Sequence, residues 1–281
     1  MEFSIIIPSH NNYKYCKLTI DSIKKNSSFN HEIIVHLNGE DIKTENYLKN
    51  ESILYSKSIE NIGLCSGVNE AFKLSSKSYI LYSHDDMYFC PLWDKYLIEE
   101  VKNIEHNKFY LSGTMIEPNS GHIKFNCGET IESFNEKKLL ENISKLNFYD
   151  HQGTHFAPHL VHKDMWNKVG GFSEEFNPGI ASDPDFNMKL WNEGVRIFKG
   201  INNFKVYHFS SITTRKKINF KQNKGDKTFL KKWGITSKFF KKHYMKSKTK
   251  YKGPLQDPKK NFIYYLDLLK CKIMYAYHGI L

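Results

Sequence analysis

The chain has 281 residues, of which 40% are hydrophobic and 15% aromatic, so it can build a core and is not disordered throughout. This length predicts one large domain or two smaller ones. No run of about 18 apolar residues occurs, which argues against a transmembrane helix. The five scattered cysteines lack CxxC spacing, which argues against a disulfide framework or a zinc ribbon and favours a reducing, cytoplasmic location.

The positive charge is concentrated towards the end of the sequence. Residues 211–281 carry 19 basic and three acidic side chains, whereas the first 210 residues carry 22 basic and 27 acidic ones. Nearly all the basic residues are lysines, which are poorer than arginines at reading bases, so specific nucleic-acid binding is disfavoured. We expect a mildly acidic domain in residues 1–212 and a basic, aromatic-rich helical extension in residues 213–281.

Strands and helices are predicted to alternate along the first 115 residues. A continuous apolar run closed by a proline predicts a buried strand over residues 3–8, and a second buried strand is predicted over residues 32–37. Further strands are predicted over residues 52–56, 78–83 and 108–116. Helical spacing predicts helices over residues 12–26 and 66–76, and a further one after Pro91. This alternation is typical of a Rossmann-like, doubly wound, mostly parallel α/β sheet. Long loops around the site are expected in residues 117–160, and short closing strands in residues 196–209.

Polar groups follow three of the predicted strands, where an open α/β sheet binds its ligands. They are Pro8-Ser9-His10, Asn38 and the segment His84-Asp85-Asp86. Two adjacent aspartates repel each other unless a cation lies between them, and a divalent metal that holds a diphosphate would relieve the repulsion. The alternative is a solvent-exposed turn that caps the helix near Pro91.

Five segments add a resemblance to these observations. In chain order they are SIIIPSHNN, ENIGLCSGVNEAF, YILYSHDDM, GGFSEEFNPGIASDPDFNMKLWNEG and VYHFSS. In this order and spacing they resemble the family 2 glycosyltransferases of GT-A fold, over roughly residues 2–212. The resemblance implies transfer of a sugar from a nucleotide diphosphate, with inversion at the anomeric carbon.

The resemblance also implies a donor pocket. The residues expected there are Pro8, Ser9, His10, Asn38, Asn61, Gly67, Asn69, His84 and Asp85. Gly63 and Gly67 would permit close backbone approach, and a helix beginning near Ser66 would direct its amide groups outward. The alternative for this stretch is an ordinary glycine-bearing loop before an amphipathic helix.

A metal site is implied by the same resemblance. Asp85 and Asp86 match the metal-binding aspartates, with Asp86 the direct ligand, and His208 matches a late contact to the metal or the diphosphate. An imidazole in the ligand set favours Mn²⁺ over Mg²⁺. His84 stands where the family often has an acid or asparagine, so it is either a neutral hydrogen-bonding residue or an additional ligand.

Asp183 and Asp185 match the acidic segment that supplies the general base. Asp183 would take the proton from the acceptor hydroxyl, with Asp185 as the substitute candidate. Ser182 stands where the family usually has glutamate. The alternative for Asp183 is a helix N-cap, followed by Pro184 at the first helical position.

The basic extension has two interpretations. Residues 215–252 mix lysines with aromatics and could lie on an anionic leaflet, which would suit a lipid-linked acceptor and a place at the inner face of the membrane. Alternatively, these residues form helices that pack on the sheet with their lysines in solvent. The last 21 residues could dock on the domain or form a homodimer contact.

The function expected is metal-dependent, inverting transfer from a nucleotide diphosphate sugar, with uridine as the favoured nucleotide. The acceptor would be a hydroxyl of a surface polysaccharide, a lipopolysaccharide or a lipid-linked sugar. The first alternative is a non-catalytic nucleotide-sugar or carbohydrate-binding protein of the same fold, which His84 and Ser182 keep open. The second is a polyanion-binding protein that depends on its basic extension.

Overall fold

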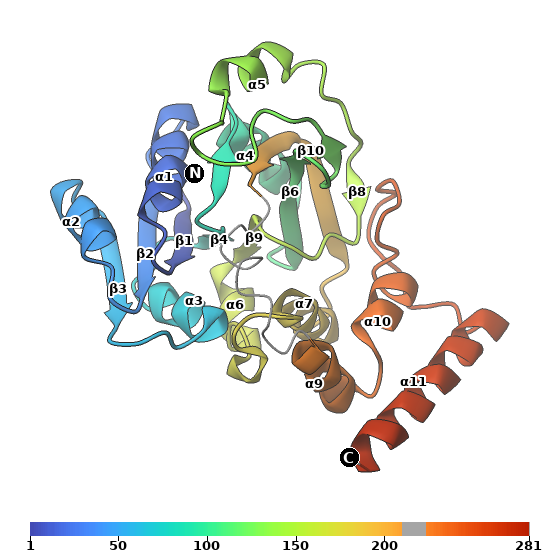
Figure 1. Ribbon diagram of the computed structural model, residues 1–281. Helices are drawn as coiled ribbons and strands as arrows, with labels where there is room; N and C mark the ends of the chain where they lie inside the picture. The colour runs from blue at the N-terminus through green and yellow to red at the C-terminus, as the bar shows by residue number, and fades with distance from the viewer. Residues whose placement is uncertain (210–222, 281) are drawn as a thin grey trace.

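The computed structural model describes residues 1–209 and 223–280, so the expected domain boundary at 212/213 lies outside the described residues. Its centre is one ten-stranded sheet, with the main strand order β3-β2-β1-β4-β9-β6-β10-β5 (Figure 1). The strands are β1 (Ser4–Ser9), β2 (Glu32–Asn38), β3 (Leu54–Ser58), β4 (Tyr79–Tyr82), β5 (Met87–Phe89), β6 (Phe109–Glu117), β7 (Ile123–Lys124), β8 (His151–Gln152), β9 (His159–His162) and β10 (Ile197–His208).

Helices cover both faces of this sheet, with α1 and α4 on one side and α3, α6 and α7 on the other (Figure 1). The helical elements are α1 (Tyr13–Asn26), α2 (Ile42–Asn50), α3 (Leu64–Phe72), α4 (Trp93–Lys102), α5 (Glu136–Asn142), α6 (Lys163–Val169), the 3₁₀ turn η1 (Glu174–Phe176), α7 (Ser182–Asn192), α9 (Asn223–Trp233), α10 (Ser237–His243) and α11 (Phe262–Ile280). None of the helices in the described ranges is long and apolar enough to cross a membrane.

The N-terminal half of the sheet confirms the doubly wound prediction. Strand β1 runs parallel to β2 on one side and to β4 on the other, and β3 runs parallel to β2. Because these strands share one direction, the residues that follow β1, β2 and β4 emerge at the same edge of the sheet. This edge collects the polar groups that the sequence places after each strand.

The other half departs from the expected pattern. Strand β9, from the region expected to be long loops, runs antiparallel between β4 and β6. The two short closing strands expected over 196–209 are one strand, β10, whose pairing with β6 shifts register between Gly200 and Lys205. Helix α3 begins and ends earlier than predicted, and neither α2 nor the three-residue β5 was predicted.

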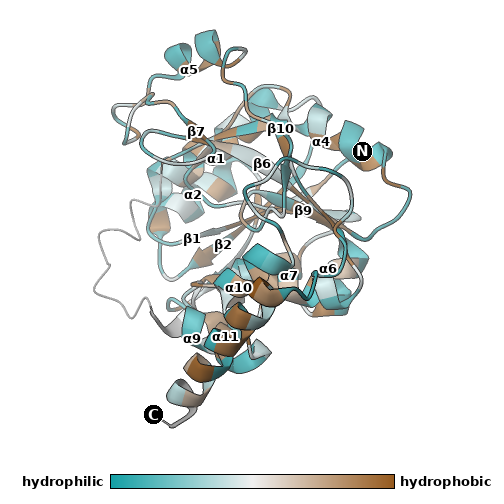
Figure 2. Ribbon diagram, turned by 90° about the vertical axis from the view of Figure 1, so that its right-hand side faces the viewer, coloured by the Kyte–Doolittle hydropathy of each residue, from teal (hydrophilic) through white to brown (hydrophobic). Residues whose placement is uncertain are grey.

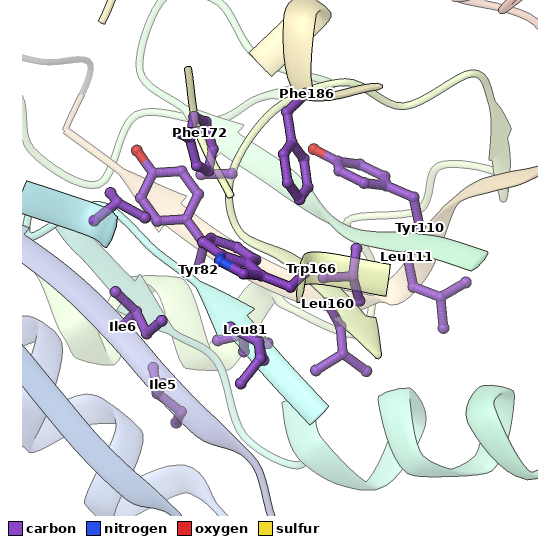
Figure 3. Packing of buried hydrophobic residues seen from close by; sticks show 14 of the residues in the cluster. Ile5, Ile6, Leu81, Tyr82, Tyr110, Leu111, Leu160, Trp166, Phe172 and Phe186 are labelled. Carbon is purple, nitrogen blue, oxygen red and sulfur yellow. The ribbon is translucent and has the colours of Figure 1, made fainter. Parts of the chain in front are cut away.

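The core lies on both sides of the central strands. Ile5, Ile6 and Leu81 are fully buried, because β1 and β4 are covered on both faces. Above β4, aromatic rings of Trp166, Phe172 and Phe186 pack together with Tyr82 and Tyr110 (Figure 3). Trp166, 1% exposed, is therefore a core residue.

The basic extension packs on the domain through its first two helices. Phe229 and Leu230 of α9 and Phe240 of α10 belong to the same buried cluster as the sheet residues. A Cβ at Gly225 would lie 2.1 Å from the backbone oxygen of Ile180, so α9 approaches the loop before α7 too closely for a larger residue. The packed interpretation is therefore right for α9 and α10, whereas residues 215–222, including Phe220, lie outside the described residues.

Asp94, in the first turn of α4, joins this helix to the segment between α1 and β2. Its fully buried carboxylate accepts hydrogen bonds from the backbone amides of Ser28 (2.7 Å) and Phe29 (2.9 Å). The His31 Nε2 atom lies 3.1 Å from the same oxygen, and His31 Nδ1 accepts from the Phe3 amide. Removing this carboxylate would leave several buried donors without an acceptor.

We expect Asp94→Ala to lower the free energy of unfolding by about 3 kcal/mol, the usual cost of breaking a buried charged network. Asp257 is the matched control, because it is 82% exposed in its ion pair with Arg196. Asp257→Ala should change the free energy of unfolding by less than about 0.5 kcal/mol. Urea denaturation measures both, and equal losses in the two variants would contradict this role for Asp94.

Candidate active site

The loops after β1, β2 and β4 meet through hydrogen bonds between residues predicted to form the donor pocket. The Ser9 hydroxyl donates to Asp85 Oδ2 at 2.6 Å, which links the ends of β1 and β4. His10 Nδ1 lies 2.5 Å from the backbone oxygen of Asn38, which links the ends of β1 and β2. Pro8 is half-buried beside them. The structure thus brings together the expected members from three strands.

The predicted asparagines form side-chain hydrogen bonds to the backbone of the loops around the site. The Asn38 amide donates to the Gly63 carbonyl and accepts from the Ile62 amide, which fixes the loop before α3. Asn61 accepts from the Gly63 amide within that loop. The Asn69 amide makes hydrogen bonds with both the backbone N–H and the carbonyl of Phe172. These side chains shape the site, and their polar atoms are engaged with the backbone.

The start of α3 differs from its sequence prediction. Asn177 Oδ1 accepts from the Cys65 amide at 2.9 Å, and a Cβ at Gly63 would lie 2.3 Å from that oxygen. The first-turn amide of α3 is therefore bound to Asn177 instead of pointing outward towards a phosphate. Gly67 faces the His36 ring of β2 with a virtual Cβ distance of 2.8 Å, so this glycine permits close packing of helix on strand.

A candidate metal centre lies at the ends of β4 and β10. His84, Asp86 and His208 each offer a ligand atom, and these atoms all lie within 4.8 Å of one another. His208 Nε2 is 3.3 Å from Asp86 Oδ1, while His208 Nδ1 is 2.6 Å from Glu117 Oε1. Glu117, at the end of β6, therefore orients the ring so that Nε2 faces Asp86, as carboxylates that bind the far nitrogen of a metal-ligating histidine do.

The two histidines of this centre have opposite electrostatic environments. Burial disfavours the charged imidazolium of His84 and lowers its pKa to about 4, so this ring is neutral and can bind a metal. Burial acts on His208 in the same direction, but the charges and hydrogen bonds of Asp86 and Glu117 outweigh it and raise its pKa to about 10. Without a metal ion, His208 is thus protonated at neutral pH between two carboxylates, so an ion that binds here would have to displace its Nε2 proton.

Asp85 does not belong to the three-residue group, although it was predicted as a ligand beside Asp86. Its carboxylate turns towards β1, where it accepts the hydrogen bond from Ser9. Burial and the neighbouring charge of Asp86 raise its pKa, while hydrogen bonds from Ser9 and Asn12 act against this rise. His84, for which two roles were open, takes the place in the group that was expected for Asp85.

Asp183 lies in the first turn of α7, within electrostatic range of this edge of the sheet. The hydroxyl of Tyr82 interacts electrostatically with Asp183 and also with Asp85 and Asp86. Asp183 Oδ1 is buried and accepts no hydrogen bond, and burial raises the pKa of the carboxyl to about 7. Ala181 is the N-cap of α7, so the alternative interpretation of Asp183 as the capping residue is wrong.

Asp185 has a different environment. It is fully buried, accepts from the Ser173 hydroxyl (2.6 Å) and the Trp233 indole (2.8 Å), and forms an ion pair with Lys232 at 3.0 Å. Lys232 and Trp233 belong to α9, so this carboxylate fastens the extension to α7. Its oxygens are engaged, which leaves Asp183 as the carboxylate suited to accept a further proton.

Several contributors to the site were missed by sequence reasoning. Glu117 stands directly after a predicted strand, the same signal that identified Asp85 and Asp86, and could have been found in this way. Asn177 and Lys232 carry no such local signal, because their partners lie far away in the sequence.

The fold and the site define an α/β protein with a group of residues that could hold a metal ion at the carboxyl edge of its sheet and, in the first turn of α7, a carboxylate with one buried oxygen. The chain belongs to glycosyl transferase family 2, since the model of that family matches residues 4–162, more than half of the sequence. No curated protein sequence matches the chain.

Solved structures with a similar fold are GT-A glycosyltransferases, which confirms the expected fold class. S. aureus TarS 1-349 in complex with UDP has a TM-score of 0.57 and 16% identity, and the match covers 74% of this chain and 60% of that one. GalNAc-T7 with UDP, GalNAc and Mn²⁺ has a TM-score of 0.58 and 12% identity, over 74% of this chain and 44% of that one.

The mannosyltransferase PcManGT from Pyrobaculum calidifontis, in complex with GDP-Man and Mn²⁺, has a TM-score of 0.53 and 13% identity. Its match covers 75% of this chain and 57% of that one. This chain therefore spans less than two thirds of the length of these structures. At such identities the likeness establishes the fold alone.

The raised pKa of Asp183 predicts a measurable cost in stability. Between about pH 4, the pKa of a free aspartate, and pH 7, the native state retains a proton that the unfolded chain has released, so the free energy of unfolding falls as pH rises. Asp183→Asn removes this effect. We expect the variant to be more stable than wild type by on the order of 2 kcal/mol at pH 8, with little difference at pH 4.

Urea denaturation in the presence of EDTA measures this difference at both pH values. Asp164→Asn is the matched control, because the Asp164 side chain is 70% exposed and should show no pH-dependent gain. A gain for Asp183→Asn that is the same at pH 4 and pH 8 would contradict the burial of an ionisable carboxyl.

Proposed function

We propose that this protein is an inverting, metal-dependent glycosyltransferase that moves a sugar from a nucleotide diphosphate sugar to an acceptor hydroxyl. The observation that carries the proposal is the pairing of the metal-ligand group His84-Asp86-His208 with the buried carboxylate of Asp183, both near Tyr82. The family match supports the reaction class, and the complexes of similar structures with UDP, UDP-GlcNAc and GDP-Man support a nucleotide-sugar donor.

The residues at the ends of β4 and β10 fit a divalent cation. A neutral imidazole from His84, a carboxylate from Asp86 and the Nε2 atom of His208 form a mixed nitrogen and oxygen set, which favours Mn²⁺ over Mg²⁺. When bound there, such an ion would offset the charge that develops on the departing diphosphate. Two of the similar structures contain Mn²⁺, which supports this assignment.

Asp183 is the proposed general base. Its carboxylate takes the proton of the acceptor hydroxyl while that oxygen bonds to the anomeric carbon and the bond from that carbon to the diphosphate oxygen breaks. Attack on the face opposite the departing diphosphate inverts the anomeric configuration. A pKa of about 7 matches this role, because about half of the carboxyl groups are ionised at neutral pH and the ionised form is basic enough to accept a proton.

The donor nucleotide is assigned to the edge formed by the ends of β1, β2 and β4. Pro8, Ser9, His10 and Asn38 would line its base and ribose, and Asp85 would contact the ribose through the position that Ser9 gives it. Uridine is the proposed nucleoside of the donor. The proposed acceptor is a growing glycan or a lipid-linked sugar, and the basic extension would bring the protein to the anionic surface that carries the lipid.

Asp183→Asn tests the catalytic role. With a panel of nucleotide sugars and acceptors as substrates and release of the nucleoside diphosphate as readout, we expect kcat to fall by about 10²- to 10⁴-fold. Binding of UDP, measured by calorimetry, should be retained. In wild type, kcat should fall as pH drops below about 7, because the base becomes protonated.

The control for this experiment is Asp164→Asn, which should keep wild-type kcat. Retained turnover in Asp183→Asn would contradict the role of Asp183. Binding of UDP without turnover of any donor by wild type would favour the alternative function, a non-catalytic nucleotide-sugar-binding protein.

The metal assignment predicts unequal effects for two adjacent aspartates. Asp86→Asn should abolish the rise in melting temperature caused by Mn²⁺ with UDP, because it removes a ligand of the three-residue group. Asp85→Asn should preserve a Mn²⁺-dependent rise, because Asp85 turns towards Ser9. Thermal denaturation with and without Mn²⁺ measures both, and the reverse ranking would contradict this ligand set.

A further inference from the structure

Helix α11 contacts the rest of the protein along one side only. Tyr264 and Cys271 are buried against α10, with the Tyr264 and Phe239 ring centroids 5.1 Å apart and Cys271 Sγ 3.7 Å from the Thr236 hydroxyl. Asp267, near the same side, is bound by Lys242 and His243 of α10. These contacts fix which side of α11 faces the protein.

The opposite side of α11 is apolar and exposed. Phe262, Leu266, Leu269 and Ile273 follow one another at intervals of four, three and four residues, so they form one stripe along the helix. Their exposed fractions are 76%, 42%, 54% and 60%. Figure 2 shows these hydrophobic stretches on a helix that lies at one end of the molecule, with α5 at the other end. Two further exposed apolar residues, Ile263 and Tyr265, flank the start of the stripe.

The charges beside this stripe are positive. Lys270 and Lys272 are exposed and flank it on its two sides, and Lys259 and Lys260 precede the helix. Asp267 is the only acid in α11, and it is shared by Lys242, His243 and Lys270. Among the side chains described in α11, the exposed face therefore has an apolar centre with a lysine on each flank, and the acid beside Lys270 is also bound by Lys242 and His243.

The lysines on the two flanks of the stripe decide between two partners that could cover the exposed side of α11. A second copy of α11 would bring lysines of one helix against lysines of the other, whereas paired helices use opposite charges beside the apolar seam. An anionic lipid surface supplies both an apolar layer for the stripe and phosphates for the lysines. Because no described helix can cross a bilayer, α11 would lie along the surface.

We propose that α11 is a lipid-docking helix that inserts its Phe262-Leu266-Leu269-Ile273 stripe into an anionic membrane surface. This inference deepens the part of the proposed function that brings the extension to an anionic surface, and its vesicle test does not depend on the transferase reaction. Contacts connect α11 to the candidate active site. Helix α11 packs on α9 and α10, and Lys232 and Trp233 of α9 bind Asp185 of α7.

Vesicle co-sedimentation of the full chain tests this proposal. Wild type should bind vesicles of phosphatidylcholine containing one third phosphatidylglycerol, and should bind pure phosphatidylcholine vesicles at least tenfold more weakly. Leu269→Glu/Ile273→Glu should lose at least tenfold in binding to the anionic vesicles. Lys270→Gln/Lys272→Gln should lose about fivefold for each lysine removed.

The matched control is Leu54→Glu/Leu74→Glu, which places the same charges at two exposed leucines of the domain, 48% and 41% exposed. This variant should bind vesicles as wild type does, and circular dichroism and melting temperature should show that all variants fold. Equal losses in the control and the α11 variant would overturn the proposal, as would equal binding to neutral and anionic vesicles or no binding by wild type.

Sedimentation equilibrium without lipid tests the other candidate partner of α11, which is a second copy of the chain. A monomeric wild type supports lipid docking. A dimer that Leu269→Glu/Ile273→Glu dissociates, together with absence of vesicle binding, would assign the face to a second copy and overturn the proposal.

Discussion

The site depends on one electrostatic constraint, which is negative charge gathered at a buried edge of the sheet. Asp86 follows β4 and Glu117 ends β6, and both carboxylates face the ring of His208 from β10. Two buried carboxylates at one edge need positive charge to balance them. Asp86 and Glu117 therefore raise the pKa of the His208 imidazole that lies between them. Under the proposed function, a divalent cation would supply this positive charge. The neutral ring of His84 lies at the same centre, whereas the carboxylate of Asp85 turns away from it towards Ser9.

Side chains from distant segments hold the loops that surround this centre. Asn38 fixes the loop before α3, Asn69 holds the backbone at Phe172, and Asn177 binds the start of α3. Asp185 extends this network to α9, so the extension supports the helix that carries Asp183. The basic segment is thus part of the structure around the site at its near end and presents an apolar, lysine-flanked helix at its far end.

The predictions for β1, β2 and β4 were right because continuous apolar runs are required wherever both faces of a sheet are covered. Strand β3 is a partly exposed edge strand that begins and ends two residues later than predicted. Strand β9 was not predicted, since four residues of HLVH carry too little pattern and their antiparallel pairing depends on β4 and β6. Helix α2 was missed although Asp41 caps it by accepting from the Thr44 amide. The start of α3 was misplaced because its first-turn amide is satisfied by Asn177, a partner that sequence distance conceals.

The sequence by itself determined the alternation of strands and helices, the family, and the presence of acids and a histidine at strand ends, because these follow from local pattern and motif order. Tertiary structure decided which of these side chains face one another. It placed His84, rather than Asp85, in the group that could hold a metal ion, added Glu117 beside that group, and separated the carboxylate of Asp183, whose Oδ1 has no hydrogen bond, from the engaged one of Asp185. Such distinctions depend on orientation and burial, which arise only when distant segments pack together.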